Sequence, residues 1–279
     1  MIKKQQKNQK SKKKKNNSYN YGYRYSYGYG YGYGYGNGYG YDKGNFQETI
    51  KTLRTNIQFS GIDNPIKTIC LTSSIPGEGK STISHFLAIE MAKAGNKTLI
   101  VECDMRRPTQ GNMFQFRPKK GITAYLSGEC SLEEVATKTQ TDNLYFLDVD
   151  AKVVNPVELM DSQRFRQAVE EMKEKFDIVI FDTLPLIMFI ESAIVASLSD
   201  ATVVVIRKGR ADIKSIKSSI QQLEKANANI IGAVYNDADE EKGLAKIGYY
   251  GLYKQNRYGK YDYEYDISSK KQKNKGKEK

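Results

Sequence analysis

The chain has 279 residues and a formal net charge of +12. Its first 18 residues carry eight lysines and no acid, and residues 267–279 carry six lysines and one glutamate, so residues 19–266 are close to neutral. Because the positive charge belongs to the two ends, the composition argues against a basic nucleic-acid-binding fold.

Other composition features exclude further classes of protein. The three cysteines, Cys70, Cys103 and Cys130, have no CxxC spacing, which argues against a disulfide framework and a zinc site. The single histidine, His85, excludes most histidine-based catalysis. No apolar run reaches the roughly 18 residues that a membrane helix needs. We therefore expect a cytoplasmic protein.

The two ends are also rich in tyrosine. Of 21 tyrosines, eleven lie within residues 19–41 and seven within residues 249–265. Tyrosine and glycine alternate over residues 19–44, and this predicts disorder rather than a strand, because a glycine face buries nothing and costs backbone entropy. We expect a disordered tail over 1–45, a folded domain over 46–247 and a second tail rich in tyrosine and lysine over 248–279.

From Phe46 onward the pattern alternates between helix and strand. It predicts helices over residues 46–59, 81–94, 131–137, 161–175, 191–198 and 212–226, and strands over residues 66–72, 97–103, 144–149, 177–181, 201–206 and 230–235. Two of the strands, 177–181 and 201–206, lack a polar face, as expected of strands covered on both sides. The alternation predicts an α/β fold with a mostly parallel sheet flanked by helices.

A phosphate-binding loop is predicted between the first strand and the following helix, where residues 73–82 read SSIPGEGKST. The backbone N–H groups of such a turn surround phosphate oxygens, and the helix N-terminus adds positive potential. Lys80 is expected to bridge the β- and γ-phosphates of ATP, and Ser81 to bind Mg²⁺. The sequence departs from the usual motif at one position, where Ser74 replaces the first glycine. The alternative interpretation is an ordinary turn between a strand and a helix. The expected nucleotide-binding residues are Pro76, Gly77, Glu78, Gly79, Lys80, Ser81 and Thr82.

Acidic residues follow two later strands of the predicted sheet. Glu102 lies near the end of the strand over 97–103 and Asp104 directly follows it, while Asp182 follows the strand over 177–181. Carboxylates at the carboxyl ends of parallel strands face the ligand crevice, although a solvated loop of mixed charge is the alternative. The expected Mg²⁺ site comprises Ser81, Glu102, Asp104 and Asp182. The expected catalytic groups are Lys80, Asp104, Arg106 and Asp182, with Asp104 accepting a hydroxyl proton and Arg106 stabilising the transferred phosphoryl group.

Taken together, these residues resemble the bacterial tyrosine kinases, the P-loop tyrosine autokinases of capsule and exopolysaccharide operons. The resemblance covers roughly residues 46–265 and rests on SSIPGEGKST, LIVECDMRRPTQ, FDIVIFDTLP, NPVELMDSQRF and the C-terminal tyrosine cluster. It implies a P-loop kinase domain over 46–247 with the activity of a non-specific protein-tyrosine kinase. It also implies phosphorylation in trans of Tyr249, Tyr250, Tyr253, Tyr258, Tyr261, Tyr263 and Tyr265.

The resemblance implies partners as well. These are a transmembrane activator or polysaccharide co-polymerase protein, protein tyrosine substrates and a cognate phosphotyrosine phosphatase, with no specific nucleic acid. It implies a homo-oligomer formed through the 46–59 helix, where the Glu-x-x-Arg-x-x-Arg pattern of the family reads Glu48, Lys51 and Arg54. It also implies peripheral association with the inner face of the cell membrane.

Some positions depart from the family pattern. Glu102 and Glu191 stand where the family has aspartate. Leu184 stands where the family has proline, two residues after Asp182, the acid that ends the Walker B motif. These departures leave open a nucleotide-binding scaffold without catalysis. A partitioning-type ATPase is disfavoured by Ile75, which replaces the signature lysine of that family. The tract over residues 19–44 is either a second region of phosphate-accepting tyrosines or a linker that associates through its aromatic side chains.

Overall fold

The computed structural model describes residues 43–150 and 153–237. The predictions for the acceptor tyrosines, for the Tyr-Gly tract and for most of both tails lie outside the described residues. The first helix, α1, spans Lys43–Ser60 and so begins before the predicted residue 46. The helix thus includes residues 43–45, which precede the predicted start.

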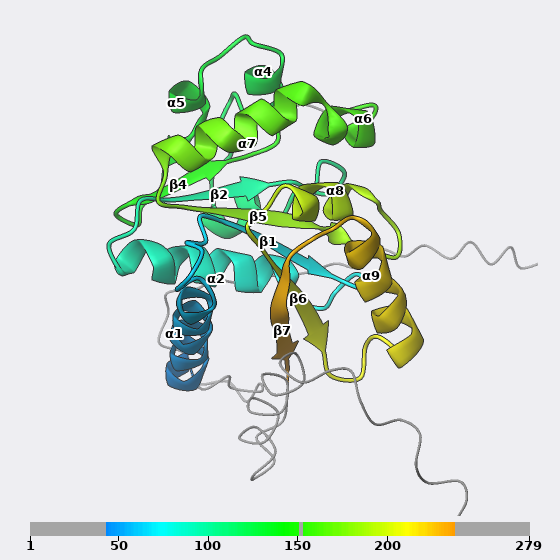
Figure 1. The fold of residues 1–279 in the computed structure, drawn as a ribbon. Coiled ribbons are helices and arrows are strands. Elements are labelled where there is room, and N and C mark those ends of the chain that lie inside the picture. The colour runs from blue at the N-terminus through cyan, green and yellow to red at the C-terminus, as the bar shows by residue number, and fades with distance from the viewer. Residues whose placement is uncertain (1–42, 151–152, 238–279) are drawn as a thin grey trace, which may run out of the picture. The chain divides into compact units, whose positions relative to one another are not determined.

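The centre of the fold is a seven-stranded sheet with the order β3-β4-β2-β5-β1-β6-β7 (Figure 1). Every described pair is parallel except the short β3, which runs antiparallel to β4. The predicted mostly parallel α/β sheet is thus confirmed. The strands are β1 Thr68–Ser73, β2 Thr98–Glu102, β3 Thr137–Lys138, β4 Leu144–Leu147, β5 Ile178–Pro185, β6 Ala201–Arg207 and β7 Ile230–Asn236.

Helices cover both faces of the sheet (Figure 1). Alternate residues of β1 show why, since Ile69 and Leu71 pack with α1 and α2 on one face, whereas Cys70 joins the core beneath α7 and α8 on the other. Successive side chains of a strand point to opposite faces of the sheet, and here both faces are apolar, so helices on both sides bury the strand completely. The remaining helices are α2 Lys80–Lys93, α3 Gln110–Phe114, α4 Ile122–Leu126, α5 Leu132–Val135, α6 Pro156–Asp161, α7 Gln163–Lys175, α8 Glu191–Ser197 and α9 Ile213–Lys225.

Most element boundaries differ from the predictions, and three of the differences have a clear physical cause. The strand predicted over 177–181 continues to Pro185, because β5 lies between β2 and β1 and pairs with β1 as far as Ser73. The helix predicted over 161–175 begins at Gln163 as α7, because the extended backbone of Ser162 ends the preceding α6 and its hydroxyl accepts the Phe165 N–H at 3.1 Å. The helix predicted over 131–137 ends early, since Thr137 pairs with β4.

None of the helices within the described residues has the combination of length and apolarity that a membrane span requires. The carboxyl ends of β1, β2, β5 and β6 lie at one edge of the sheet, since these strands are parallel neighbours. That edge carries the residues that the sequence predicts as functional.

Candidate active site

The predicted phosphate-binding loop connects β1 to α2 and has the backbone that phosphate binding requires. Gly77 and Gly79 both have left-handed φ values, 82° and 93°. A side chain at Gly77 would overlap the guanidinium of Arg210, and one at Gly79 would overlap Asn236. Gly79 is also the N-cap of α2 and offers no capping side chain. The N–H groups of the first turn of α2 are therefore left for an anion.

The side chain of Glu78 is buried and stabilises this loop. One carboxylate oxygen accepts the Ile75 N–H at 3.0 Å, and the other accepts the Arg207 N–H of β6 at 3.3 Å. The Glu78 carbonyl accepts the side-chain amide of Asn236 at 2.9 Å. The side chain of Glu78 thus ties the loop to the end of β6, and its carbonyl ties the loop to the end of β7.

Lys80, Ser81 and Asp182 come together, as the sequence predicts. Lys80 Nζ donates to Ser81 Oγ at 3.2 Å. Asp182 lies on β5, opposite Leu71 of β1, and its Oδ1 accepts from the Ser84 hydroxyl at 3.3 Å. Burial raises the pKa of Asp182, and the nearby charge of Lys80 opposes that effect. A cation, a hydroxyl and a buried carboxylate thus meet at the start of α2.

Glu102 lies at the end of β2, directly across from Asp182 on β5. Its buried carboxylate accepts three backbone N–H groups, from Asp104 at 2.9 Å, Thr109 at 2.6 Å and Gln110 at 3.0 Å. Burial, and secondarily the charge of Asp182, raises the pKa of Glu102 to about 8. The two strands therefore bring two buried carboxyl groups side by side.

Asp104 and Arg106 lie on the loop that follows β2. Asp104 Oδ1 accepts the N–H groups of Arg106 at 3.2 Å and Arg107 at 2.8 Å, so its carboxylate folds back onto its own turn. The guanidinium of Arg106 pairs with the buried carboxylate of Glu191 at 2.8 Å and lies 4.9 Å from the ring of Phe189. Arg106 is thus held against the start of α8.

Gln110 belongs to the site although it was not predicted as a site residue. It is fully buried at the start of α3, and its Nε2 donates to Asp182 Oδ2 at 2.8 Å and to the Ser81 carbonyl at 2.9 Å. Its Oε1 lies 3.2 Å from Nδ1 of His85. Its place in the LIVECDMRRPTQ segment is the one signal that the sequence offers, because a glutamine has no charge pattern that marks a site.

The donor set fits a magnesium ion that is shared with a nucleotide. Across residues 43–150 and 153–237, no three His, Cys, Asp or Glu side chains form a group that could hold a metal ion by themselves. Mg²⁺ typically retains waters and binds through one or two carboxylates together with substrate phosphates. The Ser81 hydroxyl and the Asp182 carboxylate, beside a phosphate-binding loop, supply that kind of site.

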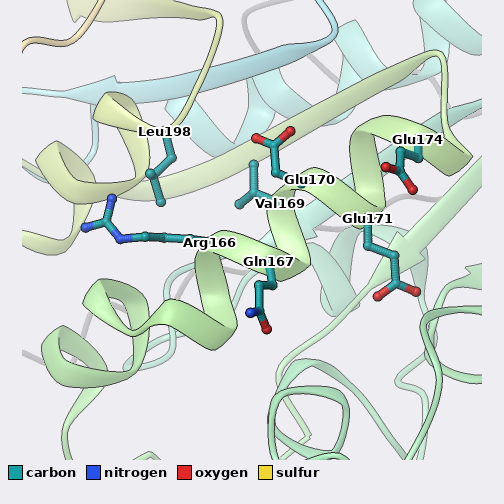
Figure 2. A pocket seen from close by; sticks show the side chains of 7 residues that line it. All are labelled: Arg166, Gln167, Val169, Glu170, Glu171, Glu174 and Leu198. Carbon is teal, nitrogen blue, oxygen red and sulfur yellow. The ribbon is translucent and has the colours of Figure 1, made fainter.

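Two surface depressions lie away from this edge. One, of about 380 Å³, lies on α7 (Figure 2), where Glu170 and Glu171 point to different sides of the helix. The other, of about 550 Å³, lies on α9 around Ile213, Lys214 and Lys217. Neither is lined by a residue of the phosphate-binding loop, so neither extends the candidate active site.

Comparisons with known proteins agree with this geometry. The AAA domain family model matches residues 66–235. The tyrosine-protein kinase CpsD of Streptococcus pneumoniae is 35% identical over 215 residues, which cover 77% of this chain and 92% of that protein. The tyrosine-protein kinase YwqD of Bacillus subtilis is 32% identical, covering 74% of this chain and 85% of that protein. The solved kinase domain of the Escherichia coli tyrosine kinase ETK superposes with a TM-score of 0.65 at 29% identity, covering 68% of this chain and 74% of that one.

Proposed function

Because the chain belongs to the bacterial P-loop tyrosine kinases, we propose that it transfers the γ-phosphoryl group of ATP to tyrosine hydroxyls of proteins, including its own. Through this activity it regulates capsule or exopolysaccharide synthesis. The observation that carries the proposal is the meeting of Lys80, Ser81 and Asp182 at the end of a glycine-rich loop. Leu184, which departs from the family pattern, is buried within β5, and its carbonyl accepts the Thr72 hydroxyl at 2.9 Å.

The roles of the residues follow from their positions. The backbone of residues 76–82 binds the phosphates, and Lys80 neutralises their β and γ oxygens. Ser81 and Asp182 hold Mg²⁺, which supplies further neutralisation of the charge that develops on the transferred group. Asp104 accepts or orients the proton of the tyrosine hydroxyl, and Arg106 stabilises the phosphoryl group.

The acceptors in this proposal are the seven tyrosines between residues 249 and 265, phosphorylated in trans by a neighbouring subunit. They lie outside the described residues. A tethered acceptor has an effective concentration of about mM, which compensates for weak intrinsic binding. The tyrosines of residues 19–41 are a second candidate acceptor region, since they belong to the same chain.

The proposed partners are those of a capsule kinase. A transmembrane co-polymerase activates the enzyme, a phosphotyrosine phosphatase reverses its action, and copies of the chain assemble through α1. The lysine-rich ends hold the protein at the inner face of the membrane. The relatives named as tyrosine-protein kinases support this setting.

The test is incubation of the purified chain with Mg-ATP, followed by detection of phosphotyrosine and mass spectrometry of its position. We expect strong labelling of the wild type and a loss of at least about 100-fold in Lys80→Met, because that change removes the cation that neutralises the β and γ oxygens. Lys225→Met is the matched control, since Lys225 is an exposed lysine in the last turn of α9. It should label as the wild type does.

The other outcomes identify the alternatives. Nucleotide binding without phosphotyrosine would favour the scaffold. Release of free phosphate that DNA stimulates, again without phosphotyrosine, would favour a partitioning-type ATPase. Labelling that Lys80→Met leaves unchanged would contradict the proposed kinase site.

A further inference from the structure

The loop between β2 and α3 carries two of the proposed catalytic groups, Asp104 and Arg106. Both oxygens of Glu102 are used to close this loop. Oε1 accepts the Asp104 N–H at its beginning, and Oε2 accepts the N–H groups of Thr109 and Gln110 at its end. A single buried carboxylate therefore ties the two ends of residues 103–109 together.

The end of this loop depends on Glu102 for its cap. Thr109 is the N-cap of α3, but its side chain makes no capping hydrogen bond, and its buried hydroxyl has no partner among the described residues. The first N–H groups of a helix need acceptors from elsewhere. Glu102 supplies that acceptor from the neighbouring strand, in place of a local capping side chain.

The length of the side chain matters for this role. Glu102 ends β2, so its backbone is fixed by pairing with β5. Replacing glutamate by aspartate would draw the carboxylate back by about 1.5 Å, the length of one carbon–carbon bond. Hydrogen bonds of 2.6 Å and 3.0 Å to Thr109 and Gln110 cannot survive such a withdrawal unless the loop moves.

Gln110 connects this anchor to the rest of the site. Its backbone N–H donates to Glu102, and its side-chain amide donates to Asp182 and to the Ser81 carbonyl. The closed loop is therefore continuous with the start of α2 and with the acid of β5.

We propose that Glu102 is a positioning residue that closes the loop over residues 103–109 and thereby fixes Asp104 and Arg106, and that it is not a ligand of the metal. The proposal rests on the proposed kinase function for its effect on activity. The closure is made by groups of this chain alone, which allows a test that is independent of metal and nucleotide.

That test is hydrogen–deuterium exchange of the full chain without Mg²⁺ or nucleotide. Glu102→Asp should speed exchange of the amides of Asp104, Thr109 and Gln110 by at least tenfold, while the phosphate-binding loop and α2 exchange as in the wild type. Glu224→Asp, the same change at an exposed position of α9, is the matched control and should alter none of these amides. Unchanged exchange of the loop in Glu102→Asp would overturn the proposal.

Steady-state kinetics supplies a second measurement. For a positioning residue, Glu102→Asp lowers kcat by tenfold or more and leaves the KM for Mg-ATP and the half-saturating Mg²⁺ concentration within twofold. For a metal ligand, the half-saturating Mg²⁺ concentration changes several-fold while exchange in the metal-free chain does not, and this result also overturns the proposal. A wild type without phosphotyrosine would defeat the proposed function but not the exchange result.

Glu102→Gln keeps the experiment decisive if the aspartate variant does not fold. The glutamine side chain has the same length and one accepting oxygen, but its NH₂ group replaces the other oxygen and cannot accept a backbone N–H. We expect exchange of the loop amides to be faster than in the wild type and slower than in Glu102→Asp. A loop as protected as that of the wild type in Glu102→Gln would contradict the requirement for two accepting oxygens.

Discussion

His85 lies beside Gln110, and its burial favours the neutral form of the ring. Its ring lies between Phe86 and Phe114, at centroid distances of 5.4 and 4.4 Å. Because Nε2 of Gln110 faces Asp182 and the Ser81 carbonyl, the amide oxygen of Gln110 faces the ring, and Nδ1 of His85 donates. Burial lowers the pKa of His85 to about 4, and the contact with Gln110 opposes part of that shift.

A consequence for stability against acid follows. The His85 side chain takes up a proton at the ordinary histidine pKa near 6.5 in the unfolded chain, but only near 4 in the folded chain. The stability that His85 contributes is therefore present at neutral pH and is lost as the pH falls from about 6.5 to about 4. Between pH 7 and pH 5 we expect a loss of about 2 kcal/mol from His85. Urea unfolding at both pH values should show this loss in the wild type and not in His85→Asn, which keeps a donor toward Gln110. Equal pH dependence in the two proteins would contradict the assignment.

At the residue scale, the contiguous motifs were the predictable part of the site. The order Gly-Lys-Ser after a strand predicts the neighbourhood of Lys80 and Ser81, and the acid after an apolar run predicts Asp182. Gln110 and the side chain of Glu78 were not predictable in these roles. Their partners lie 72 residues away on β5 and 129 residues away on β6, and only the folded sheet brings them within hydrogen-bonding distance.

At the element scale, α1 has two faces with different tasks. Ile50 and Ile57 are buried against α2 and the sheet, and the ring of Phe46 lies 5.0 Å from that of Phe86. On the outer face, Glu48 and Lys51 pair with each other at 2.7 Å. The inner face thus attaches the helix to the domain, while the outer face is the proposed assembly face.

Two substitutions separate these tasks. Ile50→Ala removes a buried side chain and should lower the free energy of unfolding by about 2–4 kcal/mol. Lys51→Glu changes an exposed position and should change stability by less than about 0.5 kcal/mol. It should also reduce the molar mass in light scattering, because it reverses the charge on the proposed assembly face. An unaltered molar mass in Lys51→Glu would contradict assembly through this face.

Element types were easier to predict than their ends. The apolar run before Asp182 predicts a strand, but its continuation to Pro185 depends on pairing with β1, which one strand's pattern does not contain. The start of α7 after Ser162 has a local signal, since a serine before Phe165 is typical of an N-cap. The alternation of elements predicts a parallel sheet, yet it does not determine that β1 lies between β5 and β6.

At the scale of the whole molecule, charge and tyrosine are concentrated at the ends of the chain. Each lysine near an anionic lipid surface contributes about 1 kcal/mol, and each phosphotyrosine adds roughly −1.5 to −2 charges. Phosphorylation of seven tyrosines would outweigh the excess of five positive charges in residues 267–279. The proposed kinase activity therefore opposes the proposed attachment to the membrane.

Sedimentation with vesicles containing phosphatidylserine tests this relation. The unphosphorylated full chain should bind, and binding should weaken with added salt as screening increases. After incubation with Mg-ATP the wild type should bind less tightly, whereas Lys80→Met treated in the same way should bind as before. Equal binding of the phosphorylated and unphosphorylated wild type would contradict the electrostatic switch, as would equal binding to neutral vesicles.

In the parallel sheet, the candidate active site lies at the edge formed by the carboxyl ends of the strands, and the opposite edge carries connecting turns. The turn at Gly95 and Asn96, which joins α2 to β2, belongs to the latter, and nothing lies within 4 Å of where a side chain on Gly95 would stand. New chain ends made at that turn would leave the phosphate-binding loop, the 103–109 loop and β5 uncut. The order of the chain could thus be rearranged by circular permutation while every group of the candidate active site keeps its neighbours.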